Sequence, residues 1–427
     1  MIEEKQAVSS TIVDGSTPRT QIMLIKRPQL IERIRPFYND HLVKVITGLR
    51  RTGKSSLLRL IADDLKETQG RSESSFLFLN FESIANQDLL NPVALYKHIA
   101  AAKSACSERL TVFLDEIQNV PDWESCVNSL RADDLCEIFI TGSNSKLLSG
   151  ELATHLAGRT IQFQVFPFSF AEFCEAWQQK NNQESLSRNE LWQQFLVRGG
   201  MPGALHYSEL SDAHQYLRDV FEGIALKDVA QRWSIRQTAI LETVFKYLMS
   251  EAGHRISAGK IEKYLKSKNL SISRDTLLEY LYAGAQTYAF ERLESEDFRG
   301  RKIRRFQPKV YLADHGFREA HHPGSNVYDI DQTLENIVCI ELLRRGWTLT
   351  TGDANGREID FIAERNGQRL YVQVAYLLAS ETAIEREFAP LMLVQDNWPK
   401  MVLSMDQANF SRSRIVHQNI LDFLLGR

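Results

Sequence analysis

The sequence lacks the cysteine pattern of a disulfide-stabilised or zinc-binding protein. It has five cysteines, and no two of them form a C-x-x-C pair. An odd and scattered set of thiols argues against a disulfide framework and is typical of a reducing compartment. The ten histidines include one adjacent pair, but no clustered Cys/His partners accompany it. We therefore do not expect a zinc site.

Long apolar runs are also missing. No stretch approaches the roughly 18–20 consecutive apolar residues that span a membrane. Residues 1–20 are polar and carry acids early, without the charged-then-apolar order of a signal peptide. We therefore expect a cytoplasmic protein that has no membrane partner, with residues 1–21 as a flexible tail.

An excess of charge of one sign is absent from the chain as a whole, whose net charge is −3. One short segment differs, because RGRKIRRFQPK at residues 299–309 holds basic side chains and no acid. Its basic residues are Arg299, Arg301, Lys302, Arg304, Arg305 and Lys309. A dense positive segment of this kind is typical of contact with a nucleic-acid backbone.

The clearest motif is GLRRTGKSS at residues 48–56, which matches the phosphate-loop pattern G-x-x-x-x-G-K-[ST]. A strand-like run, HLVKVIT, precedes it, and a segment with helical periodicity follows. The glycines let successive backbone N–H groups point inward at phosphate oxygens. We expect Lys54 to reach the terminal phosphates of ATP and Ser55 to coordinate Mg²⁺. The expected nucleotide contacts are Gly48, Leu49, Arg50, Arg51, Thr52, Gly53, Lys54, Ser55 and Ser56.

Hydrolysis requires an acid that holds Mg²⁺ and a base that activates water, and LTVFLDEIQNV at residues 110–120 supplies both. Its apolar residues predict a buried strand with two carboxylates at the carboxyl end. We expect Asp115 to hold the metal and Glu116 to orient and deprotonate the attacking water.

Two further residues could complete the reaction centre. After the strand at residues 135–141, Asn144 or Ser143 could contact the water or the γ-phosphate, whereas Ser143 or Ser145 could instead cap the next helix. Arg159 precedes the fifth expected strand and could reach a nucleotide in a neighbouring subunit. The alternative is that Arg159 only satisfies carbonyl groups at a helix end. If Arg159 reaches a nucleotide in a neighbouring subunit, the protein should form a homo-oligomer such as a hexameric ring.

The order of elements predicts an α/β fold. Strands are expected at residues 42–47, 76–82, 110–114, 135–141 and 160–165, with helices between them, which indicates a parallel sheet covered on both faces. Residues 22–170 would form this ATPase core, and residues 171–236 a helical lid with a glycine-rich break at 198–205.

Residues 237–316 predict three helices followed by a β-hairpin, which is the winged helix-turn-helix order. The third helix would then present Arg274 to a DNA groove, and the basic hairpin would contact the backbone. The alternative is that this domain is a spacer that packs against protein.

Residues 317–427 predict a helix followed by strands, an order that resembles PD-(D/E)xK nucleases. Glu335 and Asp360 match the first two acidic positions of that pattern. The third motif reads Gln373-Val374-Ala375 and lacks both an acid and the lysine. We therefore expect a weak metal site and an inactive, nuclease-like domain.

Taken together, GLRRTGKSSLL, VFLDEIQNV, ITGSNSKLLSGELATHLAGRT, FPFSFAEF, RGGMPG, LENIVCIELLRRG, EIDF and YVQVAYLL resemble one family. It comprises bacterial and archaeal AAA+ ATPases with a C-terminal nuclease-like domain of unassigned function (domain of unknown function 4143). The resemblance implies a P-loop AAA+ core, a helical lid, a winged-helix domain and a nuclease-like domain. It also implies ATP and Mg²⁺ as ligands, and catalysis through Asp115 and Glu116.

The leading functional hypothesis is an Mg²⁺-dependent ATPase that remodels DNA, with branched or forked DNA as the most attractive target. Two alternatives remain open at this point: a nucleotide-dependent switch that acts on a protein partner, and a DNA nuclease.

Overall fold

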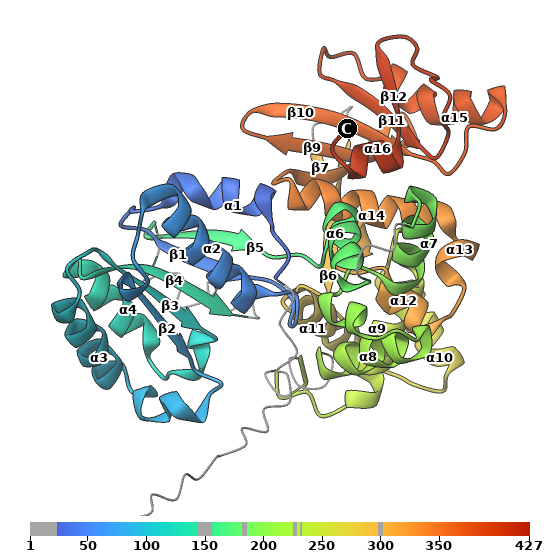
Figure 1. The fold of residues 1–427 in the computed structure, drawn as a ribbon. Helices are drawn as coiled ribbons and strands as arrows, with labels where there is room; N and C mark the ends of the chain where they lie inside the picture. The colour runs from blue at the N-terminus through green and yellow to red at the C-terminus, as the bar shows by residue number, and fades with distance from the viewer. Residues whose placement is uncertain are drawn as a thin grey trace, which may run out of the picture.

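A five-stranded parallel sheet forms the amino-terminal part of the computed structural model (Figure 1). The structure describes residues 24–142, 156, 158–181, 186–224, 229–230, 233–297 and 302–427, with the backbone alone at 297 and 302–307. The sheet order is β2-β3-β4-β1-β5. Its strands are β1 Val43–Thr47, β2 Phe76–Asn80, β3 Leu110–Asp115, β4 Cys136–Gly142 and β5 Thr160–Gln164. The predicted α/β core is confirmed, and all carboxyl ends meet at one edge because every pairing is parallel.

Helices cover both faces of this sheet, which explains why β1, β3 and β4 are buried along their whole length. On one face, apolar side chains of α1 Pro28–Ile34 and α2 Lys54–Gln69 pack against the strands. On the other face, α3 Pro92–Ala105 and α4 Trp123–Ala132 do the same. The sheet therefore exposes chiefly its edges, where a ligand could bind.

A helical region follows the sheet. Its helices are α6 Phe170–Lys180, α7 Arg188–Arg198, α8 Leu210–Gly223, α9 Thr238–Ser250, α10 Ala258–Ser267 and α11 Arg274–Ala285. Serine side chains cap two of these helices: Ser257 accepts a hydrogen bond from the Lys260 amide, and Ser273 accepts one from the Thr276 amide. A hairpin of β6 Phe290–Asp297 and β7 Lys302–Leu312 follows α11.

The hairpin is part of a larger sheet. Strand β6 pairs in parallel with β8 Thr348–Ala354, so the hairpin extends a seven-stranded sheet of order β12-β11-β10-β9-β8-β6-β7. The other strands are β9 Arg357–Arg365, β10 Gln368–Val374, β11 Lys400–Ser404 and β12 Ile415–Asn419. The accompanying helices are α12 Gly316–His321, α13 Ser325–Tyr328, α14 Ile330–Arg344, α15 Glu381–Met392 and α16 Ile420–Leu424. The boundary expected between residues 316 and 317 therefore does not separate two sheets.

The helices expected to form one lid are divided between two apolar cores. Phe173 of α6 and Phe195 of α7 pack with Val338 and Phe361 of the carboxyl-terminal region. In contrast, Leu217 of α8 lies in the core that contains α9, α10 and α11. Figure 1 shows the same division, with α6 and α7 beside α14 and α8 beside α9. Within the residues that the structure describes, no helix combines the length and apolar character needed to cross a bilayer.

Candidate nucleotide-binding site

The phosphate loop lies at the carboxyl end of β1 and leads directly into α2. Gly48 has φ +138°, and a Cβ atom there would come within 2.3 Å of the Val165 carbonyl oxygen. Gly53 has φ +95° and forms the N-cap of α2. Both positions require glycine, because a side chain would clash at the first and strain the backbone at the second. The loop can therefore keep its amide groups close to a bound anion.

Lys54 occupies the mouth of this loop. Its Nζ atom donates hydrogen bonds to the carbonyl oxygens of Gly48 at 3.2 Å and Leu49 at 3.1 Å. The same atom lies 3.8 Å from Oε1 of Glu116. Hydrogen bonds to phosphate oxygens, which carry full charge, are stronger than hydrogen bonds to neutral carbonyl groups. The ammonium group is therefore positioned to exchange these contacts for a phosphate.

Asp115 lies at the end of β3 between polar residues of both neighbouring strands. Thr141 of β4 donates its hydroxyl to Oδ1 of Asp115 at 2.6 Å, and Asn80 of β2 donates its amide to Oδ2 at 3.3 Å. These bonds fix the carboxylate at the edge where α2 begins with Lys54 and Ser55. Asp115 and Ser55 supply the oxygen ligands that suit Mg²⁺.

Glu116 follows in a left-handed backbone conformation, with φ +54°. Its amide donates to the Thr141 hydroxyl at 2.8 Å, and the Gln118 side chain donates to its carboxylate. One threonine hydroxyl thus holds both acidic residues in place. The sequence analysis did not identify Asn80 or Thr141, although both lie at the carboxyl ends of strands, where polar side chains converge.

Arg27 holds the backbone of the phosphate loop in place, and this residue was not predicted from the sequence. Its buried guanidinium donates to the carbonyl oxygens of Thr52 at 2.9 Å and Phe166 at 2.8 Å, and it lies 3.6 Å from Glu172 of α6. Burial lowers the pKa of Arg27, and the charge of Glu172 opposes this shift. One side chain thus connects the phosphate loop with the segment between β5 and α6 and with α6 itself.

The outer side of the loop is attached to the helical region. Leu49 is 1% exposed and belongs to the apolar core that contains α8, α9, α10 and α11. The guanidinium of Arg51 lies over the ring of Tyr216 in α8, 5.5 Å from its centroid. A change in the backbone of the loop would therefore alter the packing of the helices that contact it.

Arg159 lies at the opposite edge of the sheet. It immediately precedes β5, its carbonyl oxygen accepts a hydrogen bond from the amide of Val43 at the start of β1, and its side chain is exposed. Five residues of β1 separate Val43 from the loop, a span of roughly 17 Å at about 3.3 Å per residue. The backbone of Arg159 therefore lies at the end of the sheet opposite the phosphate loop of its own chain. Asn144 lies outside the described residues.

The arginine of the glycine-rich break has a structural role. Arg198 is 5% exposed and donates to Oε1 of Gln194 and to the carbonyl oxygens of Tyr207 and Ser208. These contacts leave Arg198 without access to the phosphate loop.

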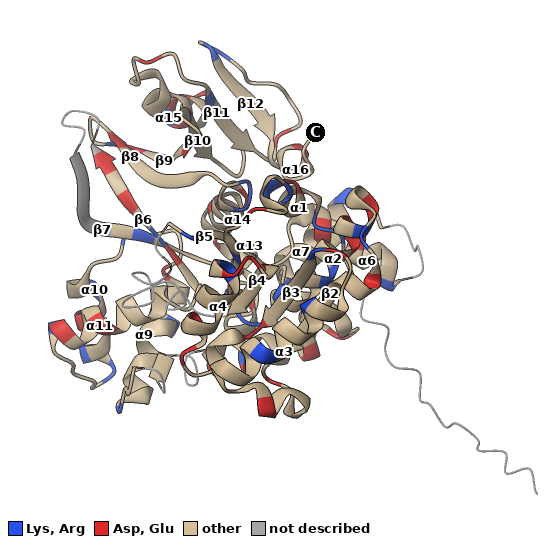
Figure 2. Ribbon diagram, turned by 90° about the vertical axis from the view of Figure 1, so that its left-hand side faces the viewer, with Lys and Arg blue, Asp and Glu red and all other residues tan. Residues whose placement is uncertain are grey.

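The structure corrects the assignment of one residue of the basic hairpin, Lys309. Lys309 is only 6% exposed and is ion-paired with Glu335 and Glu358, so it cannot reach a nucleic-acid backbone. The side chains of Lys302, Arg304 and Arg305 in β7 lie outside the described part of the chain. Strand β6, which carries Glu291, Glu294 and Glu296, runs antiparallel to β7 (Figure 2). The positive segment therefore has acidic neighbours that the linear sequence did not place beside it. Arg299 and Arg301 lie outside the described residues.

Other exposed basic residues lie on the helices instead. Arg274 begins α11 with an exposed side chain, as the sequence analysis expected. Helix α10 and its C-cap carry further exposed lysines: Lys260, Lys263, Lys266 and Lys268. We missed these lysines because they are spread along an amphipathic helix, which gives no continuous basic run.

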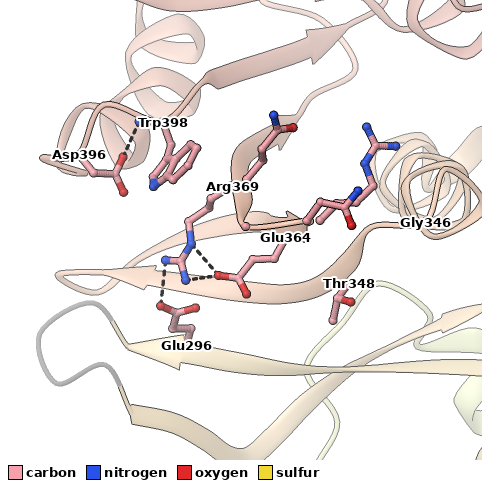
Figure 3. A pocket seen from close by; sticks show the side chains of 11 residues that line it. Glu296, Gly346, Thr348, Glu364, Arg369, Asp396 and Trp398 are labelled. Atoms are coloured by element: carbon pink, nitrogen blue, oxygen red, sulfur yellow. Dashed lines mark hydrogen bonds and ion pairs between the residues drawn. The ribbon is translucent and has the colours of Figure 1, made fainter. Parts of the chain in front are cut away.

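A large cavity of about 770 Å³ lies far from the phosphate loop, between β6, β8, the β9–β10 turn and Trp398 (Figure 3). Arg365 and Arg369 both line it. Arg369 donates to Glu364 and lies 3.2 Å from Glu296, so two carboxylates neutralise this arginine.

Comparisons with known proteins find a domain family, whole-chain relatives and similar folds. Residues 40–174 match a family model described as an AAA domain, and residues 189–326 match a domain of unknown function, DUF8612. An uncharacterized protein of Haemophilus influenzae is 33% identical over 94% of this chain and 99% of its own length. An uncharacterized protein of Methanocaldococcus jannaschii is 31% identical over 91% of this chain and 85% of its own. Among solved structures, a Walker-type ATPase of Pyrococcus abyssi aligns with a TM-score of 0.48 at 16% identity, covering 69% of this chain and 95% of that one.

Proposed function

Since the chain belongs to the same family as these uncharacterized proteins of Haemophilus influenzae and Methanocaldococcus jannaschii and contains an AAA domain, we propose that it is an Mg²⁺-dependent ATP hydrolase. The observation that carries this proposal is the convergence of Lys54, Asp115 and Glu116 at one edge of a parallel sheet. In such sheets, ligands bind at the carboxyl ends of the strands.

Each residue has a distinct task in this reaction. The loop amides and Lys54 bind and orient the phosphates, and Arg27 holds the loop backbone in position. Asp115 and Ser55 would hold Mg²⁺, which neutralises charge on the phosphate oxygens when it is bound. Glu116 accepts a proton from the attacking water, with its backbone fixed by Thr141 and its carboxylate oriented by Gln118.

A neighbouring subunit would complete the site. Arg159 is exposed at the edge opposite its own loop, so it can act only on a nucleotide held by another copy of the chain. An arginine supplied in this way stabilises charge on the transferred phosphoryl group. This role requires a homo-oligomer, for which a closed ring is the simplest symmetric solution.

We further propose that turnover acts on structured DNA through the helical unit formed by α9, α10 and α11. The burial of Leu49 in that unit provides a route from the phosphate loop to its surface. Arg274 at the start of α11 and the exposed lysines on and beside α10 supply positive charge for phosphate contacts. Recognition of shape rather than of base sequence fits a surface of this kind.

The test is the ATPase rate measured with duplex, single-stranded, forked and four-way DNA. We expect structured DNA to raise the rate several-fold. The double variant Lys263→Ala/Lys266→Ala should reduce this stimulation and lower the salt slope of DNA binding by about 1.8, at about 0.9 per lost contact. The matched control, Arg59→Ala/Lys97→Ala, removes two exposed bases from the ATPase core and should change neither quantity.

The outcomes separate the parts of the proposal. ATP hydrolysis with no response to any DNA would remove nucleic acid from the account and favour a switch that acts on a protein partner. If purified chain showed no hydrolysis under any condition, the enzymatic assignment itself would fall.

A further inference from the structure

A second charged centre lies where β7 meets the carboxyl-terminal region. Lys309 of β7 places its Nζ atom 2.6 Å from Oε1 of Glu335 in α14 and 2.8 Å from Oε1 of Glu358 in β9. Oδ1 of Asp360, two residues further along β9, lies 3.9 Å from the same nitrogen. Three carboxylates from two elements thus surround one ammonium group that comes from the hairpin.

The centre is largely closed to solvent. The exposed fractions of the side chains are 7% for Lys309, 10% for Glu335 and 9% for Asp360. Burial by itself would lower the pKa of Lys309, but the three carboxylates raise it above its ordinary value. Burial and the neighbouring charge of Glu335 raise the pKa of Asp360 well above its ordinary value, while Lys309 opposes this shift. Acids placed this close need a cation between them.

Other groups of the chain complete the shell around the acids. Tyr311 of β7 donates its hydroxyl to Glu335, and the guanidinium Nε of Arg255 lies 3.4 Å from Oε2 of Glu358. The amide of Val374 in β10 donates to Oδ2 of Asp360 at 2.9 Å. Each of the three acids therefore has a second donor besides Lys309. The donors to the carboxylates come from three separate segments: β7, the residues between α9 and α10, and β10.

The nuclease resemblance implies a divalent cation at Glu335 and Asp360, and the residues present do not fit one. The ammonium already lies between the carboxylates, at a point from which a divalent cation would be strongly repelled. Gln373, at the third acidic position, donates its amide to Glu387 and accepts from the Asp360 amide. Within the described ranges, no three His, Cys, Asp or Glu side chains are arranged to hold a metal ion.

We propose that Lys309 is the permanent cation of this centre, replacing a divalent metal and fastening the hairpin to the carboxyl-terminal sheet. The domain then serves as an anchor for the hairpin and performs no metal-dependent hydrolysis. The burial of Lys309 follows from this role: a lysine that bound nucleic acid would be exposed.

Mn²⁺ is a suitable probe, because the fraction bound can be measured by electron paramagnetic resonance. The measurement uses the full chain with Asp115→Asn, which removes the metal ligand proposed for the nucleotide site. We expect no Mn²⁺ binding by this protein at millimolar metal. Adding Lys309→Met should create binding of at least one Mn²⁺ ion per chain, after small side-chain adjustments, and adding Asp360→Asn as well should abolish it.

Two results would overturn the proposal. One is Mn²⁺ binding by the Asp115→Asn protein that Asp360→Asn removes, since metal and ammonium would then share the centre. The other is a folded Lys309→Met protein that binds no Mn²⁺, since the ammonium would then not stand in place of a metal. The first comparison keeps Lys309 intact, so it decides the matter even if the Lys309→Met variant does not fold.

Discussion

Two lysines in this molecule lie among oxygen atoms, and their surroundings differ in kind. Lys54 donates to two neutral carbonyl groups of its own loop, and its Nζ atom lies 3.8 Å from a carboxylate oxygen of Glu116. Lys309 contacts two carboxylates at 2.6 and 2.8 Å, with a third nearby. The first ammonium group can exchange its partners for a ligand, whereas the second is already neutralised by the protein.

The comparison shows why a lysine among acids does not by itself identify an active site. A reactive centre keeps its charge available, and so it needs weak local contacts and an open approach. A structural centre satisfies its charge internally, which makes removal of one partner costly. The two centres lie in different sheets of one chain, so matched substitutions can test the distinction.

The largest difference is expected for the acids of the two centres. Glu116→Gln should retain ATP binding and lower the rate of hydrolysis by about 10²–10⁴-fold, because the general base is lost. Asp360→Asn should leave the rate within twofold of the unchanged protein. Single-turnover hydrolysis of labelled ATP measures both. Normal turnover by the Glu116→Gln protein would show that another group activates the water.

Replacing each lysine by methionine should affect stability more at Lys309 than at Lys54, which is the reverse of the order expected for the rate of hydrolysis. Lys309→Met leaves three clustered carboxylates without their cation and should lower the free energy of unfolding by about 3–5 kcal/mol. Lys54→Met removes two hydrogen bonds to carbonyl groups and an ion pair to Glu116 that is longer than those of Lys309, and it should cost about 1 kcal/mol. Denaturant titrations of the two variants provide the comparison. Equal losses of unfolding free energy would contradict the conclusion that carboxylates of the protein neutralise Lys309 but leave Lys54 able to bind a ligand.

Substitution of Leu49 tests whether the nucleotide site around Lys54 is coupled to the helical unit. Leu49→Ala creates a cavity in that core and should destabilise the protein by about 2–4 kcal/mol, while also weakening ATP binding roughly tenfold. Leu241→Ala, in the same core but remote from the loop, should cost similar stability and leave ATP affinity unchanged. Both readouts come from calorimetric titration and thermal unfolding. Unchanged ATP affinity in Leu49→Ala would show that the core and the loop act independently.

The smallest effect concerns Glu291 of β6, which accepts a hydrogen bond from Gln164 of β5 and so links the two sheets. Burial raises the pKa of Glu291 to about 7, against an ordinary value of 4.5, although the Gln164 bond opposes the shift. The protonated form is thus favoured in the folded protein, and this contribution to stability, complete below pH 4.5, is lost as the pH rises to about 7.

Glu291→Gln removes this titration and keeps the acceptor oxygen. Its stability relative to the unchanged protein should rise by about 1 kcal/mol between pH 5 and pH 8, a reduced figure because the side chain is half-buried. Thermal unfolding at the two pH values measures the change. A constant difference between the two proteins would place the pKa of Glu291 in its ordinary range.

Much of the nucleotide centre could be predicted from sequence, because its parts are local. Loop, lysine and acids each belong to a strand and the residues that follow it, so periodicity and spacing suffice to place them. Thr141, Asn80 and Arg27 could not be found this way, because their importance depends on which strands are neighbours. Leu49 was predicted only as one of the nucleotide contacts of the loop, and the packing of α8 to α11 explains why its side chain is buried.

The charged centre around Lys309 shows more clearly which contacts cannot be predicted from the sequence. Lys309 and Glu335 are separated by 25 residues of intervening chain, and Glu358 and Asp360 follow a further strand. A run of basic residues suggested an exposed surface, since spacing along the chain cannot show which member of the run turns inward. The continuation of the hairpin into the carboxyl-terminal sheet, through β6 and β8, is a long-range pairing of the same kind.

The most direct test of the account is the binding of ATP with Mg²⁺, measured by calorimetric titration of the unchanged protein, Lys54→Ala and Lys309→Met. We predict binding by the first and third proteins and a loss of at least 100-fold in affinity for Lys54→Ala. If Lys54→Ala bound ATP as tightly as the unchanged protein, the loop would not be the nucleotide site and the central claim would be wrong.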